Sequence, residues 1–299
     1  MQRVLIAGCS SLLGGTIART LIARGDDVHA LIRDSTPRDR LPNEIPSSNL
    51  HLTDGTTESL MVAVEQAAPN ITYHLTGLYL RQPEISEVIP VVQSNFQYGI
   101  QLAEALCRSS KPVKLVNLGT YSQYYNSVTP QPLDLYSALK QAYVGMLDYY
   151  RKGFDFHALS LIQYDSYGIG DSRKKLIFAL RQAVKNKTVL PLSDPDIVMD
   201  LIHIKDAAAA VIHAADGLSG SPTDFSGRTY GVSGQRLMLG ELVALFGEIA
   251  GHPIETQWGA YPLPERRIMV PWDGPSLPGW AAKIPLREGL SELIDADRL

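Results

Sequence analysis

A tyrosine and a lysine four residues apart, Tyr136 and Lys140, have the spacing of an acid–base pair. The surrounding pattern predicts a helix over 135–151, in which this spacing places both side chains on one face. A free tyrosine phenol has a pKa of about 10, too high for ready proton exchange at neutral pH. A neighbouring ammonium favours the phenolate and lowers that pKa. The pair therefore predicts a proton donor, Tyr136, tuned by Lys140, although the same spacing is common on amphipathic surface helices.

Hydroxyl side chains follow the strand predicted over 113–118, in the segment Gly119-Thr120-Tyr121-Ser122. A hydroxyl at this strand end could hydrogen-bond a substrate carbonyl and hold it against Tyr136. Thr120 and Ser122 are both candidates, and for each the alternative is a hydroxyl that caps a turn. The predicted catalytic residues are thus Thr120, Ser122, Tyr136 and Lys140.

A glycine-containing loop, GCSSLLGG over 8–15, lies between the first predicted strand (4–7) and a predicted helix (14–24). Backbone N–H groups at a helix start can bind a pyrophosphate at the positive end of the helix dipole. Gly8 suits the tight turn and Gly14 suits close helix packing, while Ser11 replaces the usual middle glycine. An ordinary βα turn is the alternative, but the position at the start of an alternating chain favours a dinucleotide. The predicted contacts are Gly8, Ser10, Ser11, Leu12, Leu13 and Gly14.

The residue after the second predicted strand (28–32) bears on which dinucleotide is bound. An acidic residue there usually accepts from the ribose of NAD, whereas an arginine accommodates the 2′-phosphate of NADP. The chain has Arg33 followed by Asp34, so NADP is favoured and NAD remains the alternative. Asp54, after the strand predicted over 50–52, is a candidate acceptor for the adenine amino group. The alternative for Asp54 is a turn residue that begins the next helix.

Short apolar segments alternate with helical patterns through the first 165 residues. Strands are predicted over 4–7, 28–32, 50–52, 71–75, 113–118 and 159–163, and helices over 14–24, 57–67, 94–109 and 135–151. Continuously apolar strands that alternate with helices are typical of an α/β protein with a parallel sheet covered on both faces. The predicted fold is therefore a Rossmann-type doubly wound parallel sheet, which binds ligands at the carboxyl ends of its strands.

Glycine and proline become dense after about residue 164, and the predicted elements become short. Helices are expected over 205–215, 239–250 and 286–296, and the proline-rich stretch 261–280 is expected to be a surface loop. We predict a dinucleotide-binding domain over 1–165 and a smaller C-terminal α/β substrate domain over 166–299. Some segments of the second are expected to be able to return to the first.

Composition excludes several classes of function. The 299 residues are 45% hydrophobic and 19% charged, with a formal net charge of −4, which argues against disorder and against nucleic-acid binding. No apolar segment has the length of a membrane span, and no leader pattern precedes the first strand. The two cysteines suit a reducing compartment, and the seven histidines are scattered. A cytoplasmic protein with no metal site is expected.

The chain resembles the extended short-chain dehydrogenases/reductases, in the NAD-dependent epimerase/dehydratase group, over essentially its whole length. The motifs that carry the resemblance are GCSSLLGG (8–15), HLTG (74–77), Asn95 before a helix, YSALK (136–140), DSYGIGD (165–171) and DLIHIKDAAAA (200–210). The resemblance implies a Rossmann fold and a catalytic set of Thr120, Tyr136 and Lys140. It also implies cofactor contacts from Leu75, Thr76, Gly77 and Asn95, besides Tyr136 and Lys140.

Within that group, NLGTYSQYYN (117–126) and ERRIMVPW (265–272) resemble the nucleotide-sugar 4-ketoreductases. This implies a nucleotide-linked 4-keto-6-deoxyhexose as substrate and a homodimer paired through the helices 94–109 and 135–151. The chain departs from the pattern at Tyr121, where many relatives carry the catalytic Ser or Thr. It also has Pro264 where an arginine often binds the diphosphate, which leaves Arg266 or Arg267 for that role. Lys175 is a second candidate for the diphosphate.

A 4,6-dehydratase is disfavoured, because no carboxylate follows Thr120. Three other functions remain open. An NADP-dependent 4-ketoreductase agrees with Arg33, and an epimerase that retains NAD is the alternative. A non-catalytic dinucleotide sensor has lower weight, since it would not need Tyr136 and Lys140 in register.

Overall fold

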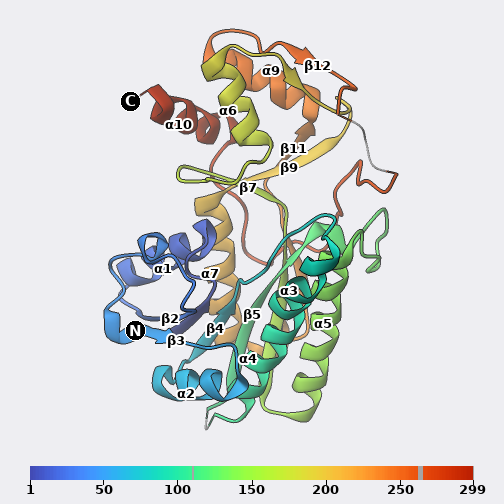
Figure 1. The fold of residues 1–299 in the computed structure, drawn as a ribbon. Helices are drawn as coiled ribbons and strands as arrows, with labels where there is room; N and C mark the ends of the chain where they lie inside the picture. Colours follow the sequence, from blue (N-terminus) through green and yellow to red (C-terminus); the bar gives the residue numbers. More distant parts are fainter. Residues whose placement is uncertain (110, 262–264, 299) are drawn as a thin grey trace.

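The larger lobe is built on a seven-stranded parallel sheet. The computed structural model describes residues 1–109, 111–261 and 265–298. The strand order is β10-β6-β5-β4-β1-β2-β3, and all the pairings are parallel. This confirms the predicted doubly wound fold (Figure 1). The strands are β1 (Arg3–Ala7), β2 (Asp27–Ile32), β3 (Leu50–Leu52), β4 (Ile71–His74), β5 (Val113–Thr120), β6 (Phe156–Gln163) and β10 (Thr229–Val232).

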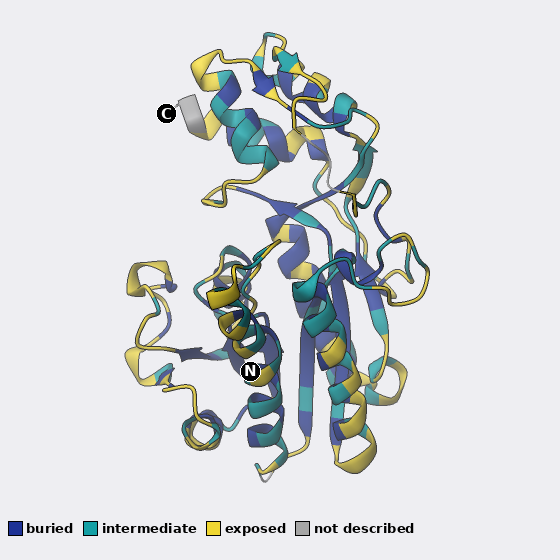
Figure 2. Cartoon of the chain, turned by 45° about the vertical axis from the view of Figure 1, so that its right-hand side comes forward, coloured by how far each residue is buried: buried dark blue, intermediate teal, exposed yellow. Residues whose placement is uncertain are grey.

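Two layers of helices cover the sheet because its strands are apolar on both faces. In β1, Val4 and Ile6 pack in one core cluster and Leu5 and Ala7 in another, as the two-residue period of a strand requires. The first cluster is completed by α1 (Leu12–Ala23) and α7 (Ile204–Gly220). The second is completed by α2 (Thr57–Ala67), α4 (Tyr98–Cys107) and α5 (Leu135–Gly153). The strands are buried while the outer helix faces are exposed (Figure 2).

The helix that leads to α4 contains a π-helical turn. It runs through α3 (Val88–Val92), the π turn over Gln93–Gln97 and α4, so it begins earlier than the 94–109 expected. Such single π turns inside α-helices are frequent at functional sites. The turn carries the fully buried Asn95.

A smaller lobe lies beyond the carboxyl edge of the sheet (Figure 1). It contains a mixed sheet, in the order β11-β9-β7, and a strand pair, β12-β8. Its apolar core includes Leu180, Leu242, Phe246 and Leu290. Its elements are α6 (Leu176–Asn186), α9 (Leu239–Ala250), α10 (Leu286–Arg298), β7 (Asp165–Tyr167), β8 (Leu190–Pro191), β9 (Val198–His203), β11 (Gln235–Met238) and β12 (Thr256–Gln257).

Two segments beyond residue 165 return to the larger lobe. Strand β10 pairs with β6 at the edge of the main sheet, and α7 packs beside α1. In α7, Ala207, Ala208 and Ala210 are almost completely buried, and such small side chains let this helix lie close to the sheet. The short helix α8 (Pro222–Phe225) follows α7. Single 3₁₀ turns occupy Arg38–Arg40, Ser47–Asn49, Ile85–Glu87 and Tyr121–Gln123.

Candidate active site

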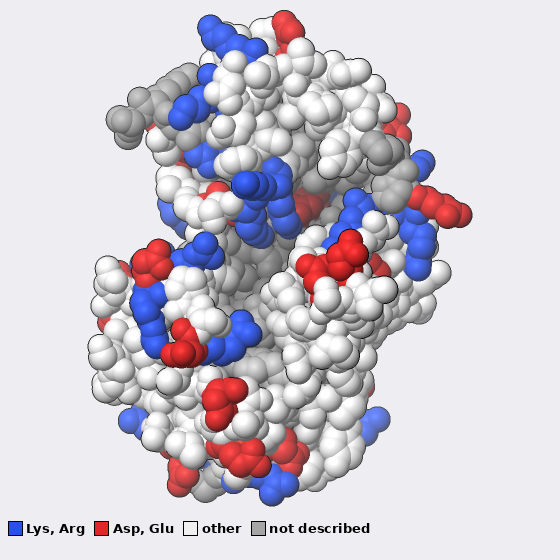
Figure 3. Space-filling view, in the orientation of Figure 1, with Lys and Arg blue, Asp and Glu red and all other residues white. Residues whose placement is uncertain are grey.

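A cleft of about 930 Å³ opens between the two lobes. On the side of the larger lobe, its walls come from the carboxyl ends of β4 and β5 and from the first turns of α5. The opposite wall comes from β7, the start of α6, and the residues Ser193, Ile197, Tyr261, Arg267 and Ile268. Figure 3 shows the hollow between the lobes, with Lys and Arg side chains gathered on both sides of it. A cleft of this size and position is the default ligand site of an α/β sheet.

The structure brings Tyr136 and Lys140 together at the floor of this cleft. Helix α5 starts where Asp134 caps it, because the Asp134 carboxylate accepts from the backbone N–H of Ser137 at 2.8 Å and from its hydroxyl at 2.7 Å. This cap fixes the first turn, on which Tyr136 lies. Lys140 Nζ is 5.9 Å from the centre of the Tyr136 ring.

Two backbone carbonyls hold the Lys140 ammonium in the interior. Its Nζ donates to the carbonyl oxygens of Thr76 at 2.6 Å and Leu118 at 3.1 Å. The side chain is only 2% exposed, and burial lowers the pKa of Lys140 to about 8. Among the described residues these are its hydrogen-bond partners, so a third N–H remains for a ligand.

The pKa of Tyr136 differs from the sequence-based expectation. Burial, followed by the negative charge of Asp134 and the neighbouring Tyr79 phenol, raises it to about 12. The sequence predicts that Lys140 lowers this pKa, but its ammonium is held by the two carbonyls and burial of the phenol dominates, so the pKa is raised instead. Tyr136 is therefore a neutral proton donor in the polypeptide at neutral pH.

Thr120 and Ser122 both face the cleft from the turn after β5. Their hydroxyl oxygens lie 3.1 Å apart, and the Thr120 hydroxyl also accepts from the backbone N–H of Ser122 at 3.4 Å. Gln123 fixes the turn, since its amide accepts from the N–H of Thr120 and donates to Gln141 on α5. The hydroxyls thus take part in capping the turn and are also presented to the cleft.

The glycine loop between β1 and α1 has the close packing of a dinucleotide-binding turn. Gly8 has a positive φ of 100°, and a Cβ there would lie 3.1 Å from the Leu75 carbonyl carbon. A Cβ on Gly14 would lie 2.2 Å from the Gly8 oxygen, so a side chain is excluded. The N–H groups of Leu12 and Leu13 open α1 and have no partner among the described residues. These residues fit a pyrophosphate at the helix start.

Ser11 turns toward its own helix rather than away from it. Its hydroxyl donates to the Gly8 oxygen at 2.8 Å and accepts from the Gly14 N–H at 3.0 Å, so it caps α1. The Ser11 hydroxyl is therefore engaged within the loop and the first turn of the helix. Ser10 lies half-buried beside it in the same loop.

Arg33 and Asp34 are both exposed after β2. The backbone N–H of Arg33 donates to the Thr36 hydroxyl at 2.9 Å, which shapes the turn. Asp54 accepts from the N–H and the hydroxyl of Thr56, and these bonds lower its pKa to about 2. One carboxylate oxygen of Asp54 therefore shapes the start of α2, in line with the turn alternative.

Leu75, Thr76 and Gly77 follow β4 and line the cleft. A Cβ on Gly77 would lie 3.2 Å from the Asn95 amide oxygen and 3.4 Å from side-chain carbons of Tyr136 and Lys140, so this position is tightly packed. The amide of Asn95 accepts from the N–H of Leu78 at 3.0 Å and donates to its carbonyl at 2.9 Å. Asn95 thus holds the loop that packs against Tyr136 and Lys140.

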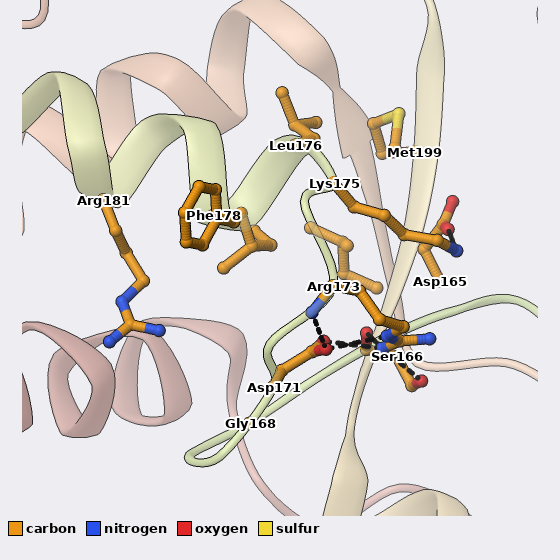
Figure 4. A pocket seen from close by; sticks show the side chains of 12 residues that line it. Asp165, Ser166, Gly168, Asp171, Arg173, Lys175, Leu176, Phe178, Arg181 and Met199 are labelled. Carbon is orange, nitrogen blue, oxygen red and sulfur yellow. Dashed lines mark hydrogen bonds and ion pairs between the residues drawn. The ribbon is translucent and has the colours of Figure 1, made fainter. Parts of the chain in front are cut away.

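The opposite wall carries charged residues that bind one another. Asp165 lies 3.5 Å from Lys175 Nζ and accepts from the Tyr121 phenol at 3.2 Å. Arg173 pairs with Asp171 and donates to the Ser166 carbonyl oxygen at 2.8 Å (Figure 4). A smaller hollow of about 50 Å³ opens beside these residues. Asp165 is not among the site residues predicted from the sequence, and the available signal is a carboxylate two residues after the end of β6.

The two arginines of the segment 265–268 point to different places. Arg267 lines the cleft. Arg266 donates to the Pro132 carbonyl oxygen at 2.8 Å and lies over the Tyr125 ring, with its guanidinium carbon 4.9 Å from the ring centre. Arg266 is exposed and is not part of the cleft lining, and Pro264 lies outside the described residues. Tyr79 and Arg81, in the loop after β4, also line the cleft and were not selected from the sequence.

The described residues contain neither a metal-binding cluster nor a membrane-spanning helix. They hold no group of three or more His, Cys, Asp or Glu side chains placed to bind a metal ion. In the same part of the chain, no helix is long and apolar enough to cross a membrane.

A doubly wound sheet, a phosphate-binding turn at α1 and a Tyr/Lys pair on α5 define the class of Rossmann-type short-chain dehydrogenases/reductases. The model of the NAD dependent epimerase/dehydratase family matches residues 4–226, and the chain belongs to that family. This confirms the resemblance drawn from the motifs.

Similar proteins agree with that assignment. CDP-abequose synthase of Yersinia pseudotuberculosis is 22% identical over 271 residues, which is 90% of this chain and 92% of that protein. The UDP-glucose 4-epimerase of Thermus thermophilus, solved with NAD, has a TM-score of 0.80 and 21% identity over 99% of both chains. MoeE5, solved with UDP-glucuronic acid and NAD, has a TM-score of 0.80 and 22% identity over 99% of this chain and 98% of that one. At these identities the solved structures establish the fold.

Proposed function

We propose that the protein reduces the 4-keto group of a nucleotide-linked 4-keto-6-deoxyhexose with NADPH. The observation that carries the proposal is that the cleft lining brings together Tyr136, Thr120, Ser122 and a buried Lys140 with an N–H left for a ligand. The similarity to CDP-abequose synthase over nine-tenths of the chain supports this subgroup. The turn Thr120–Gln123 carries no carboxylate, which argues against a dehydratase.

Each of these residues has a separate role in the proposed reaction. The Thr120 and Ser122 hydroxyls bind the ketone oxygen and orient it toward Tyr136. Tyr136 donates its proton to that oxygen as negative charge develops there. The nicotinamide, when bound, supplies the hydride. Lys140 uses its remaining N–H to hold the nicotinamide ribose, and its charge stabilises the phenolate that Tyr136 becomes.

The dinucleotide would lie along the carboxyl edge of the sheet. In this proposal its pyrophosphate is bound by the N–H groups of Leu12 and Leu13, with Gly8, Ser10, Ser11 and Gly14 shaping the loop. Arg33 would pair with a 2′-phosphate, and Asp54 would receive the adenine amino group through its remaining carboxylate oxygen. Leu75, Thr76 and Gly77 would contact the nicotinamide half.

Cofactor preference follows from Arg33. Replacing Arg33 by serine removes the phosphate partner, and we expect the preference for NADPH over NADH to fall about tenfold or more. Kinetics with each cofactor measure it, and an unchanged preference would assign the 2′-phosphate to another residue. Asp34, exposed beside Arg33, is the residue that would favour NAD.

On the substrate side, we propose that the diphosphate binds between Lys175, Arg173 and the segment 265–268. Arg266 was selected for this role from the sequence, but the cleft lining favours Arg267. Lys175 already has a partner in Asp165 and contributes less than a free ammonium would.

We also propose a cytoplasmic homodimer. Both cysteines are free thiols, as expected in a reducing compartment. The outer part of α5 exposes Tyr149 to 58%, and the adjoining Phe154 is exposed to 46%. Pairing of α4 and α5 across a two-fold axis would bury them, and light scattering on the purified protein would give twice the 32.8 kDa chain mass.

The test is oxidation of NADPH in the presence of CDP- or dTDP-4-keto-6-deoxyglucose, with NADH in parallel. Turnover that needs NADPH and is lost in Tyr136→Phe is the expected result. Absence of turnover with both cofactors, together with NAD that stays bound through purification, would instead establish an NAD-dependent epimerase. Two solved proteins of the same fold carry NAD in their structures, which keeps that alternative in view.

A further inference from the structure

Three neighbouring strands place a row of polar side chains inside an otherwise apolar layer. His74 on β4 is in register with Asn117 on β5, and Asn117 is in register with Ser160 on β6. His74 and Asn117 are completely buried and Ser160 is 3% exposed. Since buried polar groups are costly unless they are bonded, a row of this kind calls for a specific arrangement of donors and acceptors.

The hydrogen bonds define that arrangement. Asn117 donates its amide N–H to the Ser160 hydroxyl at 3.2 Å, and its amide oxygen lies 2.9 Å from His74 Nδ1. Because the amide oxygen is only an acceptor, Nδ1 carries the proton, and Nε2 of the neutral ring is an acceptor. The Thr76 hydroxyl, 2.8 Å from Nε2, is then the donor of the last bond.

Packing fixes the plane of the imidazole. The His74 ring meets the Tyr143 ring edge-on at 4.9 Å and stacks on Tyr98 at 6.2 Å. Tyr143 on α5 and Tyr98 on α4 belong to the helix layer that covers this face of the sheet. These ring contacts and the hydrogen bonds at both nitrogens hold the ring with Nδ1 on Asn117 and Nε2 on Thr76.

Thr76 connects this row of polar side chains to Lys140. Thr76, whose hydroxyl bonds His74, accepts the 2.6 Å bond from Lys140 Nζ at its carbonyl oxygen. Burial and then the Lys140 charge lower the pKa of His74 to about 3, so the ring is neutral and its Nε2 acceptor is maintained throughout the neutral range. The phenols of Tyr98 and Tyr143, also next to the ring, stay protonated because burial raises the pKa of each.

We infer that His74 is a positioning residue for the Lys140 ammonium. As a neutral Nδ1–H imidazole fixed by Asn117 and Ser160, it accepts from the Thr76 hydroxyl and so fixes the carbonyl oxygen that holds Nζ. The consequence for catalysis rests on the proposed function, in which Lys140 supports Tyr136. The hydrogen-bonded row itself is a property of the polypeptide.

The test compares two variants in which a threonine is replaced by valine, which has the same shape but no hydroxyl. Thr72 lies on β4, and Thr76 lies just after it. Thr76→Val removes the donor to His74 and keeps the carbonyl that binds Lys140. Thr72→Val removes a buried hydroxyl from the same strand that has no partner in the described part of the chain. Thr76→Ser keeps the donor and tests for rescue.

We expect Thr76→Val to lower kcat by up to about tenfold and to shift the alkaline limb of the pH profile of kcat/KM. Thr76→Ser is expected to restore the position of that limb, and Thr72→Val to leave it in place. A Thr76→Val profile identical to that of Thr72→Val would overturn the inference.

Nitrogen-15 NMR of the histidine rings in the free protein supplies a measurement that needs no turnover. His74 is expected as the Nδ1–H tautomer, without titration between pH 5 and 9, roughly the range in which an ordinary histidine would titrate. An Nε2–H tautomer, or titration near the ordinary value, would contradict the inference. If the protein does not reduce the ketone, the proposed function is wrong, but the NMR result still decides whether His74 has the Nδ1–H tautomer that the hydrogen-bonded row requires.

Discussion

The two walls of the cleft are constructed differently. On the wall formed by β4, β5 and α5, the chemical groups are buried and held by backbone atoms, as Lys140 is held by the Thr76 and Leu118 carbonyls. On the wall formed by β7 and α6, the charged groups are half-exposed and are held by one another, as Lys175 is held by Asp165. Backbone anchors are fixed by the fold, whereas ion pairs between exposed side chains are weak.

This difference separates the type of reaction from the choice of substrate. A rigid catalytic wall keeps Tyr136 and Lys140 in one geometry for every member of a substrate class. A wall of exchangeable ion pairs can adapt to different nucleotides and sugars at little cost in stability. Substitutions on the first wall should therefore affect kcat strongly, and substitutions on the second should change KM modestly.

The largest effect is expected from Tyr136→Phe. Loss of the proton donor should reduce kcat by about 10²-fold or more, the usual contribution of a general acid. Thermal unfolding of the variant should match that of the parent, because Tyr136 lines the cleft and the change removes a single oxygen atom. A variant that keeps more than about one-tenth of the parent activity would mean that this wall does not supply the proton.

The pH dependence of kcat/KM should come from Lys140, on the same wall of the cleft. Burial lowers the pKa of Lys140 to about 8, so the ammonium is present below that pH and is lost above it. Tyr136 keeps its proton throughout this range, because burial raises its pKa to about 12. The value of kcat/KM should therefore fall as pH rises through about 8, and a profile that rises there would contradict the assignment.

A smaller effect is expected from the arginines of the opposite wall. Arg267→Ala removes a cation from the cleft lining and should raise KM for a nucleotide-linked substrate about tenfold. Arg266→Ala, the matched control, removes a cation that lies over Tyr125 outside the lining, and KM should change less than about twofold. Steady-state kinetics on both variants measure this, and a larger effect at Arg266 would restore the sequence-based assignment.

The smallest effect is expected from Asp165→Asn. The change removes the charge that pairs with Lys175 and frees this ammonium for the diphosphate, so KM should fall about two- to threefold. The negative charge of Asp165 is also the first cause of the raised pKa of Tyr121. Ultraviolet titration should therefore show Tyr121 ionising at lower pH in the variant, and an unchanged titration would argue against the contact.

Local patterns were enough to predict one wall but not the other. The helices over 57–67 and 239–250 have the predicted bounds, because each is an apolar periodicity with a clear start and end. The Tyr136–Lys140 pair depends on a spacing of four residues within one helix, which the sequence displays directly. The parallel sheet likewise follows from apolar strands that alternate with helices.

Features that depend on contacts between distant segments could not be predicted. Lys140 is anchored by carbonyls 64 and 22 residues away in the sequence. The raised pKa of Tyr136 comes from burial, which also depends on distant segments and could not be predicted from one helix. Arg266 and Arg267 are adjacent in sequence, and only the path of the loop decides which one enters the cleft. The His74–Asn117–Ser160 row requires the strand register, which no single segment encodes.

The most direct test of the catalytic wall follows an isotope from cofactor to sugar. NADPH that carries deuterium at both nicotinamide C4 positions is incubated with a nucleotide-linked 4-keto-6-deoxyhexose, and the product is examined by mass spectrometry and NMR. One deuterium at sugar C4 for each NADPH consumed, lost in Tyr136→Phe, is the predicted result. No NADPH consumption and no deuterium in the sugar, with the same protein interconverting the C4 epimers of a nucleotide-linked hexose, would contradict the reductase assignment.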